Sequence, residues 1–349
     1  MLTDILAYGA VADGITDSTA AIQHAIDACA AASGGRVTIP AGVFRTYTLS
    51  LKTNVELHLE AGAVLRGGDD PLGYPLFEPN DIWRVERAPR FNRRALFYTL
   101  GQEHVSITGQ GTIDGNAAKF HSFDGIHLSA SSDVVVSDCV VHSQDDAFVF
   151  RSHQEQLFTP RPLERVAVSN CVCSTVCACF RFGWSGDWLV RDIRIDNVTC
   201  SDSWVGLAIT LPPLNPENCK DPPRAPELPL LSEDFRKPFE CRRIRISNWS
   251  CVSTAEPIQL AFGNAYRTEP VAAVRDISLS HCDLEGRGHP VFVVWPENNV
   301  GSLHFDDVSF VIRAPTPRKT VPADAVWFDN CDDVTFDRCR WSVLSADAQ

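Results

Sequence analysis

The sequence has no apolar run near the roughly 20 residues that a membrane-spanning helix requires, which excludes a helical integral membrane protein. Positive charge is also scarce, because 31 Lys and Arg face 44 Asp and Glu and the formal net charge is −13. Affinity for nucleic acid comes largely from Lys and Arg. The sequence therefore predicts neither a membrane nor a nucleic-acid partner, and it gives no indication of oligomeric state.

The N-terminus also lacks the basic start, apolar core and small-residue cleavage site of a signal peptide. We expect a cytoplasmic protein, or a secreted one if a leader has been removed. The 13 cysteines are odd in number and none shows the C-x₂-C spacing of a zinc site. Most lie in strand-like segments, where a free Cys behaves as a small apolar residue. We therefore predict mainly reduced core thiols, with no metal and no cofactor.

A short phrase recurs along the chain: alternating β-branched residues, a polar pair, then a small or apolar residue. It occurs as Val134-Val-Val-Ser-Asp-Cys139, Val166-Ala-Val-Ser-Asn-Cys171, Ile193-Arg-Ile-Asp-Asn-Val198, Ile244-Arg-Ile-Ser-Asn-Trp249, Ile277-Ser-Leu-Ser-His-Cys282, Leu303-His-Phe-Asp-Asp-Val308 and Val334-Thr-Phe-Asp-Arg-Cys339. The starts lie 26 to 33 residues apart, except for one step of 51. Units of this length bury their apolar faces only by stacking, which gives ladders of like residues. This pattern predicts an all-β, right-handed parallel β-helix.

The same repeat runs through most of the chain, so we predict one β-helix domain over residues 1–349. An N-terminal cap over about 1–50 contains an amphipathic helix that protects the open sheet edge. The Pro-rich stretch over about 211–241 reads as one long loop, because the repeat resumes on both sides of it. The apolar face of the capping helix consists of Ile22, Ala25, Ile26 and Cys29.

Three acidic residues, Asp124, Asp145 and Asp146, immediately precede alternating strands. Their spacing of 21 and 22 residues is close to one coil, and adjacent parallel strands lie about 4.8 Å apart. The three carboxylates should therefore share one patch, where like charges raise at least one pKa. Hydrolysis of a glycoside needs two carboxyl groups in different protonation states, an acid that protonates the leaving oxygen and a base that activates water.

Turn geometry and calcium binding are two alternative roles for these acids. An Asp at a strand–turn boundary often only stabilises the turn. This role is a sufficient explanation for isolated residues such as Asp138, Asp196 and Asp307. A bound calcium ion would also use such hard oxygen ligands. Three acids on stacked coils repel one another, and function accounts for that repulsion better than turn geometry does.

Several stretches resemble the polygalacturonase family, glycoside hydrolase family 28. They are Tyr8-Gly-Ala-Val-Ala-Asp-Gly-Ile-Thr-Asp17, Gly34-Gly-Arg-Val-Thr-Ile-Pro-Ala-Gly42, the segment from Leu51 to Leu65, Gly109-Gln-Gly-Thr-Ile-Asp-Gly115, Asp124-Gly-Ile and Gln144-Asp-Asp146. The resemblance implies a right-handed β-helix and an inverting hydrolase. It also implies that Asp145 is the general acid, and that Asp124 and Asp146 hold the attacking water.

The chain departs from the family at two motifs. The family's Gly-His-Gly aligns with Cys177-Ala178-Cys179, and its Arg-Ile-Lys aligns with Ala208-Ile209-Thr210. The histidine and the cations that grip a uronic-acid carboxylate are thus missing. The candidate substrate-binding residues near the acids or in comparable positions of later coils are Arg151, Arg181, Trp184, Trp204, His153, Glu256 and His289.

We therefore predict a glycosidase that cleaves an α-linked pectic or related oligo- or polysaccharide by an inverting mechanism. We expect it to be exo-acting, with a specificity that differs from polygalacturonase. A polysaccharide lyase or epimerase on the same fold is one alternative, although lyases usually need Ca²⁺ together with Arg or Lys. A non-catalytic carbohydrate-binding β-helix is the other alternative, but it gives no reason for the three acids.

Overall fold

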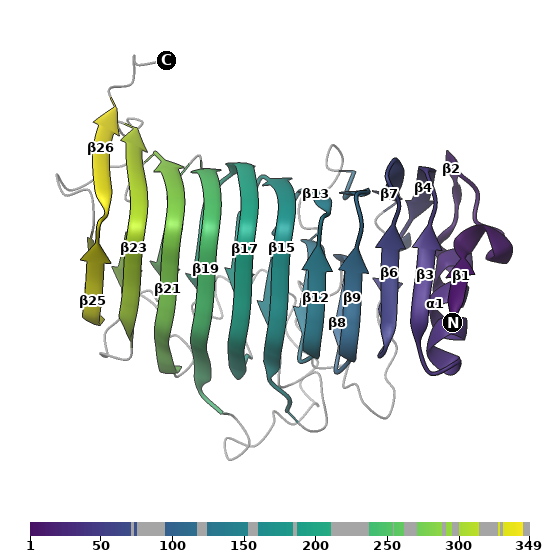
Figure 1. Ribbon diagram of the computed structural model, residues 1–349, viewed down its shortest axis with the longest axis horizontal. Coiled ribbons are helices and arrows are strands. Elements are labelled where there is room, and N and C mark those ends of the chain that lie inside the picture. Colours follow the sequence, from purple (N-terminus) through teal and green to yellow (C-terminus); the bar gives the residue numbers. More distant parts are fainter. Residues whose placement is uncertain are drawn as a thin grey trace, which may run out of the picture.

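The computed structural model describes residues 1–70, 73–74, 95–116, 124–152, 160–183, 187–210, 237–253, 255–261, 271–287, 291–294, 300–313, 327–328 and 331–344. The described chain folds as a right-handed parallel β-helix, as the repeat predicts. Figure 1 shows the coils stacked side by side along one axis, from the N-terminal coils to the C-terminal ones.

One sheet of nine strands carries the candidate site. Its order, from the C-terminal to the N-terminal end, is β24 (Trp327–Phe328), β22 (Val291–Val294), β20 (Ile258–Ala261), β18 (Val205–Thr210), β16 (Ala178–Phe182), β14 (Phe148–Arg151), β11 (Asp124–Ser129), β8 (Ala95–Leu100) and β5 (Leu49–Ser50). All described pairs in this sheet are parallel. We call it the site sheet.

The other described strands form a second, larger sheet. Its short strands are β1 (Leu2–Asp4), β2 (Asp13–Asp17), β3 (Gly35–Ile39), β4 (Gly42–Thr46), β6 (Val55–Leu59), β7 (Ala63–Gly67), β9 (Glu103–Thr108), β10 (Thr112–Asp114), β12 (Ser132–Ser137), β13 (Val140–Ser143), β25 (Cys331–Asp337) and β26 (Arg340–Leu344). Its long strands are β15 (Leu163–Thr175), β17 (Leu189–Ser203), β19 (Phe239–Ser253), β21 (Val271–Gly286) and β23 (Val300–Arg313). Each long strand continues through the corner that divides the shorter strands of earlier coils.

The polar pair of the repeat makes this corner. Its second residue has a left-handed backbone in every repeat, a conformation that Asn and Asp accept more readily than most residues. The φ values are 64° at Asp138, 54° at Asn170, 52° at Asn197, 51° at Asn248, 53° at His281, 50° at Asp307 and 51° at Arg338. The amide of Asn197 donates to Asn170 at 2.9 Å, and the amide of Asn170 donates to Asp138 at 3.1 Å. The turn chemistry expected for Asp138 and Asp307 is therefore confirmed.

The residue after the pair points into the core and stacks on its neighbours. Cys171 pairs in register with Val198, and Val198 pairs with Trp249. Cys282 pairs with Val308 in the same way, and all five side chains are at most 1% exposed. The ladder predicted from the sequence is thus confirmed.

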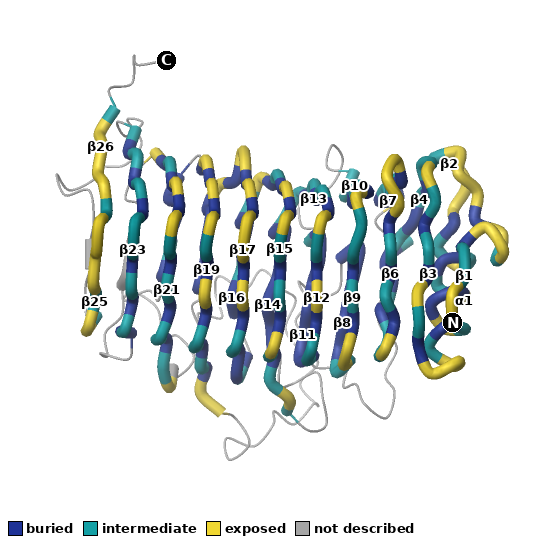
Figure 2. Tube along the Cα trace, in the orientation of Figure 1, coloured by how far each residue is buried: buried dark blue, intermediate teal, exposed yellow. Residues whose placement is uncertain are grey.

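Helix α1 (Thr19–Ala31) follows the 3₁₀ turn η1 (Ile5–Tyr8) and lies at the N-terminal end of the stack, as Figure 1 shows. Its predicted apolar face is completely buried, with Ile22, Ala25, Ile26 and Cys29 at 0% exposure. None of the described helices has the length and apolar character needed to cross a membrane. At the opposite end, β25 and β26 are largely exposed, as Figure 2 shows.

The predicted Pro-rich loop over 211–241 is too long at its C-terminal end, because β19 already begins at Phe239. Phe239 and Cys241 are buried on either side of the partly exposed Glu240, which is the alternation of a strand. Residues 211–236 lie outside the described part of the chain.

Candidate active site

The register of β11 and β14 brings two of the acids together. Ile126 pairs with Phe148, so Asp124 and Asp146 occupy matching positions just before the paired segments. The backbone N–H of Gly125 donates to the carbonyl of Asp146 at 2.9 Å, which fixes this alignment. Asp145 is the neighbour of Asp146 in the chain, and all three acids feel one another's charge. The structure thus places the three predicted acids on one patch at the edge of the site sheet.

The side chain of Asp146 accepts hydrogen bonds from three donors. Arg181 approaches it with Nε at 2.9 Å from Oδ2 and Nη2 at 3.2 Å from Oδ1. The backbone N–H of Ala178 donates to the same Oδ1 at 3.0 Å. The Asp146 and Arg181 side chains are only 10% and 12% exposed, so this is a largely buried, two-pronged ion pair.

Asp145 has a raised pKa in this patch. Burial raises its pKa to about 7, and the neighbouring charges of Asp124 and Asp146 add to the rise. A hydrogen bond from Cys177 and the charge of Arg181 act in the opposite direction. Its pKa matches that of a general acid working near neutrality.

Asp124 is paired with a histidine on its own strand. His127 Nδ1 lies 2.8 Å from Asp124 Oδ2, and the imidazole is almost fully buried. Burial, followed by the charge of Arg151, lowers the pKa of His127 to about 3, so the imidazole is neutral. Burial and the charge of Asp146 raise the pKa of Asp124 well above its usual range, against Arg151 and Arg181.

Arg151 lies beneath this patch and is ion-paired with Asp187. The two side chains are 3% and 0% exposed, and Asp187 also accepts the backbone N–H of Ser152 at 2.8 Å. The sequence predicts that Arg151 binds substrate. In the structure its guanidinium is buried, and its charge lowers the pKa of both Asp124 and His127.

Two of the predicted substrate-binding residues lie farther along the site sheet. Trp204 immediately precedes β18, is 49% exposed, and donates its backbone N–H to Cys177 O at 2.9 Å. Glu256 aligns with Asp146 three strands away, through the register of β18 and β20, and is 8% exposed. At about 4.8 Å per strand it lies roughly 14 Å from Asp146 along the site sheet. His153, Trp184 and His289 lie outside the described residues.

The positions of the two missing family motifs form a small apolar cluster beside the acids. Ala178, Val205 and Ala208 pack together and are at most 1% exposed. Arg181 on β16 pairs in register with Ala208 on β18. The site therefore has an arginine one strand away from the position at which the family motif has its arginine. That cation is already engaged by Asp146.

Three residues of the site were not identified from the sequence: His127, Cys177 and Asp187. His127 lies three residues after Asp124, and this short spacing is the feature of the sequence that points to it as a partner of Asp124. Cys177 and Asp187 reach the acids and Arg151 only through the coil stacking.

A calcium ion fits this geometry poorly. The oxygen atoms of Asp145 and Asp146 and the sulfur of Cys177 lie within 4.8 Å of one another. Calcium takes six to eight oxygen ligands, whereas sulfur is a soft ligand. Arg181 already neutralises Asp146. The guanidinium of Arg181 therefore already supplies the positive charge that a calcium ion would bring to Asp146.

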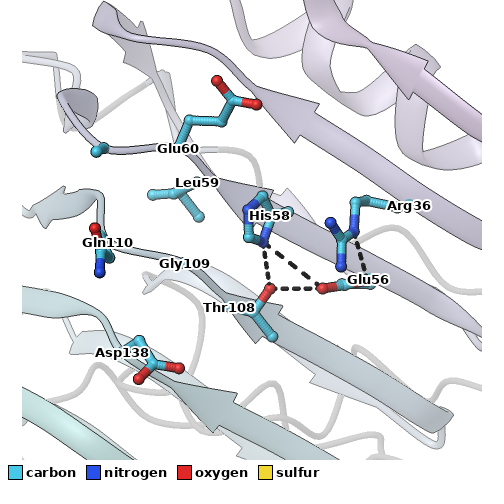
Figure 3. Close-up of a pocket in the computed structure, with 10 residues that line it drawn as sticks. Arg36, Glu56, His58, Leu59, Glu60, Thr108, Gly109, Gln110 and Asp138 are labelled. Carbon is cyan, nitrogen blue, oxygen red and sulfur yellow. Dashed lines mark hydrogen bonds and ion pairs between the residues drawn. The ribbon is translucent and has the colours of Figure 1, made fainter.

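A separate pocket of about 550 Å³ lies on the outer face of the larger sheet, near β6 and β9. Figure 3 shows Thr108 between His58 and Glu56. Thr108 Oγ1 donates to Glu56 at 2.7 Å, so His58 Nδ1, also 2.7 Å from that hydroxyl, is its donor. Arg36 donates to the other oxygen of Glu56 at 2.8 Å. These side chains form hydrogen bonds with one another, as polar side chains on a protein surface commonly do.

Comparisons with known proteins support the resemblance. Residues 2–61 match the family described as rhamnogalacturonase A/epimerase, pectate lyase-like. The chain is 37% identical over 125 residues to the exo-poly-alpha-D-galacturonosidase of Dickeya chrysanthemi, covering 33% of this chain and 20% of that protein. It is 47% identical over 58 residues to the mannuronan C5-epimerase AlgE2 of Azotobacter vinelandii, covering 14% of this chain and 6% of the epimerase. The matches thus span a small part of these longer relatives.

Solved structures agree on the fold. The polygalacturonase of Erwinia carotovora ssp. carotovora superposes with a TM-score of 0.58 at 12% identity, over 97% of this chain and 92% of that one. The hyperthermoactive exopolygalacturonase of Thermotoga maritima gives 0.54 at 14% identity, over 98% and 91%. By these partial sequence matches the chain is similar to polygalacturonases and related pectin-acting proteins, and its fold is a right-handed parallel β-helix.

Proposed function

We propose that the protein is a glycoside hydrolase that cleaves an α-linked pectic or related saccharide with Asp124, Asp145 and Asp146. The observation that carries this proposal is the gathering of three carboxyl groups in different environments at one edge of the site sheet. Burial raises the pKa of Asp145 to about 7, whereas Asp146 accepts hydrogen bonds from Arg181 and the Ala178 N–H. A glycosidase needs this pairing of a proton donor with a carboxylate.

The roles follow from the contacts. Asp145, partly exposed and protonated, donates to the departing glycosidic oxygen. Asp124 and Asp146 position a water on the other side of the sugar, and the proton of that water passes to this pair. Asp124 is the better acceptor, because the three donors on Asp146 already occupy its oxygens. His127 keeps Asp124 oriented through its 2.8 Å hydrogen bond. Proton nuclear magnetic resonance of the first product should show an inverted anomeric configuration.

The pH dependence of the reaction should reflect Asp145. Since Asp145 must be protonated and its pKa is about 7, kcat/KM should fall about tenfold per unit above pH 7, and an acidic limb should appear where Asp124, the proton acceptor, becomes protonated. Initial rates from pH 4 to pH 9 with a fixed substrate check this. A rate that stays flat up to pH 9 contradicts the assignment of Asp145 as the acid.

The substrate class comes from the relatives and from the altered subsite. The matched relative from Dickeya is named for action on galacturonate polymers. In this chain Ala178 and Ala208 replace the polar groups of the family motifs, and Arg181 is committed to Asp146. We therefore infer that the sugar bound beside the acids is held without the carboxylate clamp of polygalacturonases. A panel of pectic and neutral α-linked oligosaccharides tests this.

We further propose that the enzyme acts from chain ends and trims short oligosaccharides. Exo action releases small products from the start and leaves polymer viscosity nearly unchanged while reducing ends accumulate. A rapid fall in viscosity at low conversion contradicts this mode of action.

An epimerase or lyase is the second candidate, favoured by the local match to mannuronan C5-epimerases. The matched family segment, residues 2–61, ends before Asp124 and so does not include the acids. Following reducing ends and ultraviolet absorbance together separates the reactions. New reducing ends without absorbance indicate a hydrolase, whereas absorbing product indicates a lyase. Changed sugar composition without either indicates an epimerase, and binding without turnover indicates a carbohydrate-binding module.

Trp204 should bind sugar without taking part in the chemistry. Its exposed ring lies two strands from Asp145, where it can stack on a neighbouring pyranose. Replacing it by Ala should raise KM by roughly threefold to tenfold with little change in kcat, since such stacking contributes about 0.5–1.5 kcal/mol. Trp341, 41% exposed on β26, provides a control, because Trp341→Ala should leave KM unchanged. An equal effect of both substitutions on KM excludes the subsite.

A further inference from the structure

The coil formed by β25 and β26 presents core side chains to solvent at the C-terminal end of the stack (Figure 2). Three of its inward-facing side chains stack in register on side chains of β23: Phe336 on Phe305, Trp341 on Phe310 and Val343 on Ile312. The three residues of β23 are at most 7% exposed, whereas the three above them are 38%, 41% and 69% exposed. The end of the stack is therefore an apolar surface with the composition of a core layer.

The two aromatic rings of this coil lie flat on the coil beneath. The ring centroids of Phe336 and Phe305 are 4.8 Å apart, with 9° between the ring planes. Those of Trp341 and Phe310 are 4.1 Å apart, with 11° between the planes. Because each ring is nearly parallel to the one beneath it, its opposite face is turned toward the end of the stack. Such a face is best covered by another aromatic or branched apolar side chain.

The outer edge of the same coil carries backbone groups that can pair with another strand. β25 and β26 both pair with β23 on one side, and no other described strand pairs with either of them. An open edge of this kind is a template for a strand from another chain. At the other end of the stack lies α1, as Figure 1 shows, and it blocks a head-to-tail array of copies. A contact between two C-terminal ends, in which one surface meets itself, gives a closed dimer instead.

We propose that two copies of this chain associate through β25 and β26 as a two-fold symmetric dimer. A two-fold axis beside the left-handed corner at Arg338 lays β25 of each copy antiparallel to β26 of the other. Inward side chains then meet inward side chains. Phe336 lies opposite Trp341 of the second copy, and Val334 lies opposite Val343 of the second copy. The apolar ends of the two stacks thus become one continuous core.

The outward side chains are complementary in charge in this register. Asp337 lies opposite Arg340 of the second copy, and symmetry makes this contact occur twice. The two side chains are 71% and 62% exposed, so both are accessible. Arg340 also contacts Asp307 of its own chain, but a guanidinium has five N–H donors and can serve a second carboxylate. Opposite charges across an antiparallel pair favour the pairing, and this self-complementarity favours a second copy over an unrelated partner.

The dimer leaves the acids of both copies open to saccharide. Asp146 precedes β14, which lies five strands from β24 at the C-terminal end of the site sheet. At about 4.8 Å per strand this separation is roughly 24 Å. Loss of the dimer should therefore leave the activity per chain unchanged.

The molecular mass in solution tests the proposal. Size-exclusion chromatography with light scattering should give twice the mass of one chain at micromolar concentration. Sedimentation velocity over a dilution series should then show dissociation to one chain and give the Kd. A mass of one chain at every concentration, or an array larger than a dimer, overturns the proposal.

A matched pair of variants locates the contact. Val343→Lys places a charge in the apolar contact and should raise the Kd at least about tenfold. Val343 is 69% exposed in the single chain, so the fold should tolerate the change. Val252→Lys, on β19 and 47% exposed, is the control and should leave the Kd unchanged. Circular dichroism checks that each variant is folded, and a Val343→Lys protein that dimerises like wild type overturns the contact.

Charge reversal tests the register without touching the apolar layer. Asp337→Arg and Arg340→Asp each place like charges opposite one another, so each alone should raise the Kd at least about tenfold. The double variant again has opposite charges across the contact and should recover most of the wild-type affinity. A double variant that remains as weak as the single ones overturns the proposed pairing of β25 with β26.

Discussion

Asp145→Asn should reduce kcat/KM on the preferred saccharide by roughly 10²–10⁴-fold while the fold remains intact, because it removes the proton donor and little volume. The amide retains the size of the carboxyl group and can still contact Cys177. The reduction is measured as initial release of reducing ends at pH 6, where the wild-type acid is protonated. Asp138→Asn is the matched control, because Asp138 occupies a left-handed corner that Asn accepts equally well.

A general acid has a further signature. A substrate whose leaving group departs without protonation, such as a nitrophenyl glycoside, should be cleaved by Asp145→Asn at a rate much closer to that of wild type. Equal losses on both kinds of substrate would show that Asp145 binds sugar or supports the fold instead.

The same substitution should stabilise the protein at alkaline pH. The pKa of Asp145 is about 7 in the folded state against a usual value of 3.8, so the folded protein binds this proton more tightly. Ionisation therefore costs stability as pH rises from about 4 to 7, and the full cost is present above pH 7. Asp145→Asn should then raise the free energy of unfolding by about 2–4 kcal/mol at pH 8 and by little at pH 4. Urea unfolding at both pH values measures the difference.

The opposite effects of one substitution on activity and stability are the expected mark of a functional acid. A carboxyl group retained only for turn geometry, such as Asp138, should give neither effect.

The sequence allowed prediction of those parts of the molecule that repeat. The corner residues, the ladder of Cys171, Val198 and Trp249, and the face of α1 depend on local periodicity, and the structure has each of them. The grouping of Asp124 with Asp146 followed from the same logic, since residues one coil apart stack. The end of the Pro-rich loop was misplaced, because Phe239 and Cys241 offer only a short alternation beside Pro238.

The partners of the site could not be predicted in this way. Asp187 meets Arg151 across 36 residues, and nothing in its local sequence distinguishes it from a surface acid. Arg151 and Arg181 were equivalent candidates in the sequence, yet one pairs with Asp187 within the fold and the other with Asp146 at the site.

The buried pair of Arg151 and Asp187 leads to the largest expected loss of stability. Asp187→Asn removes the charge that compensates a guanidinium only 3% exposed, and breaking a buried ion pair costs about 3–5 kcal/mol. We expect a loss near the lower value, because the amide oxygen can still accept the N–H of Ser152. Asp133→Asn is the control, since Asp133 pairs with the half-exposed Arg165 and should lose at most about 1 kcal/mol.

This substitution also tests the electrostatic part of the site. The charge of Arg151 lowers the pKa of both His127 and Asp124, whereas the charge of Asp187 opposes it at His127. Without Asp187, the net positive field at these residues grows, and ionised Asp124 is favoured at lower pH. The acidic limb of the pH–rate profile should therefore shift downward in Asp187→Asn and stay in place in Asp133→Asn. An unshifted limb in a folded Asp187→Asn would mean that Arg151 supports the fold without tuning the acids.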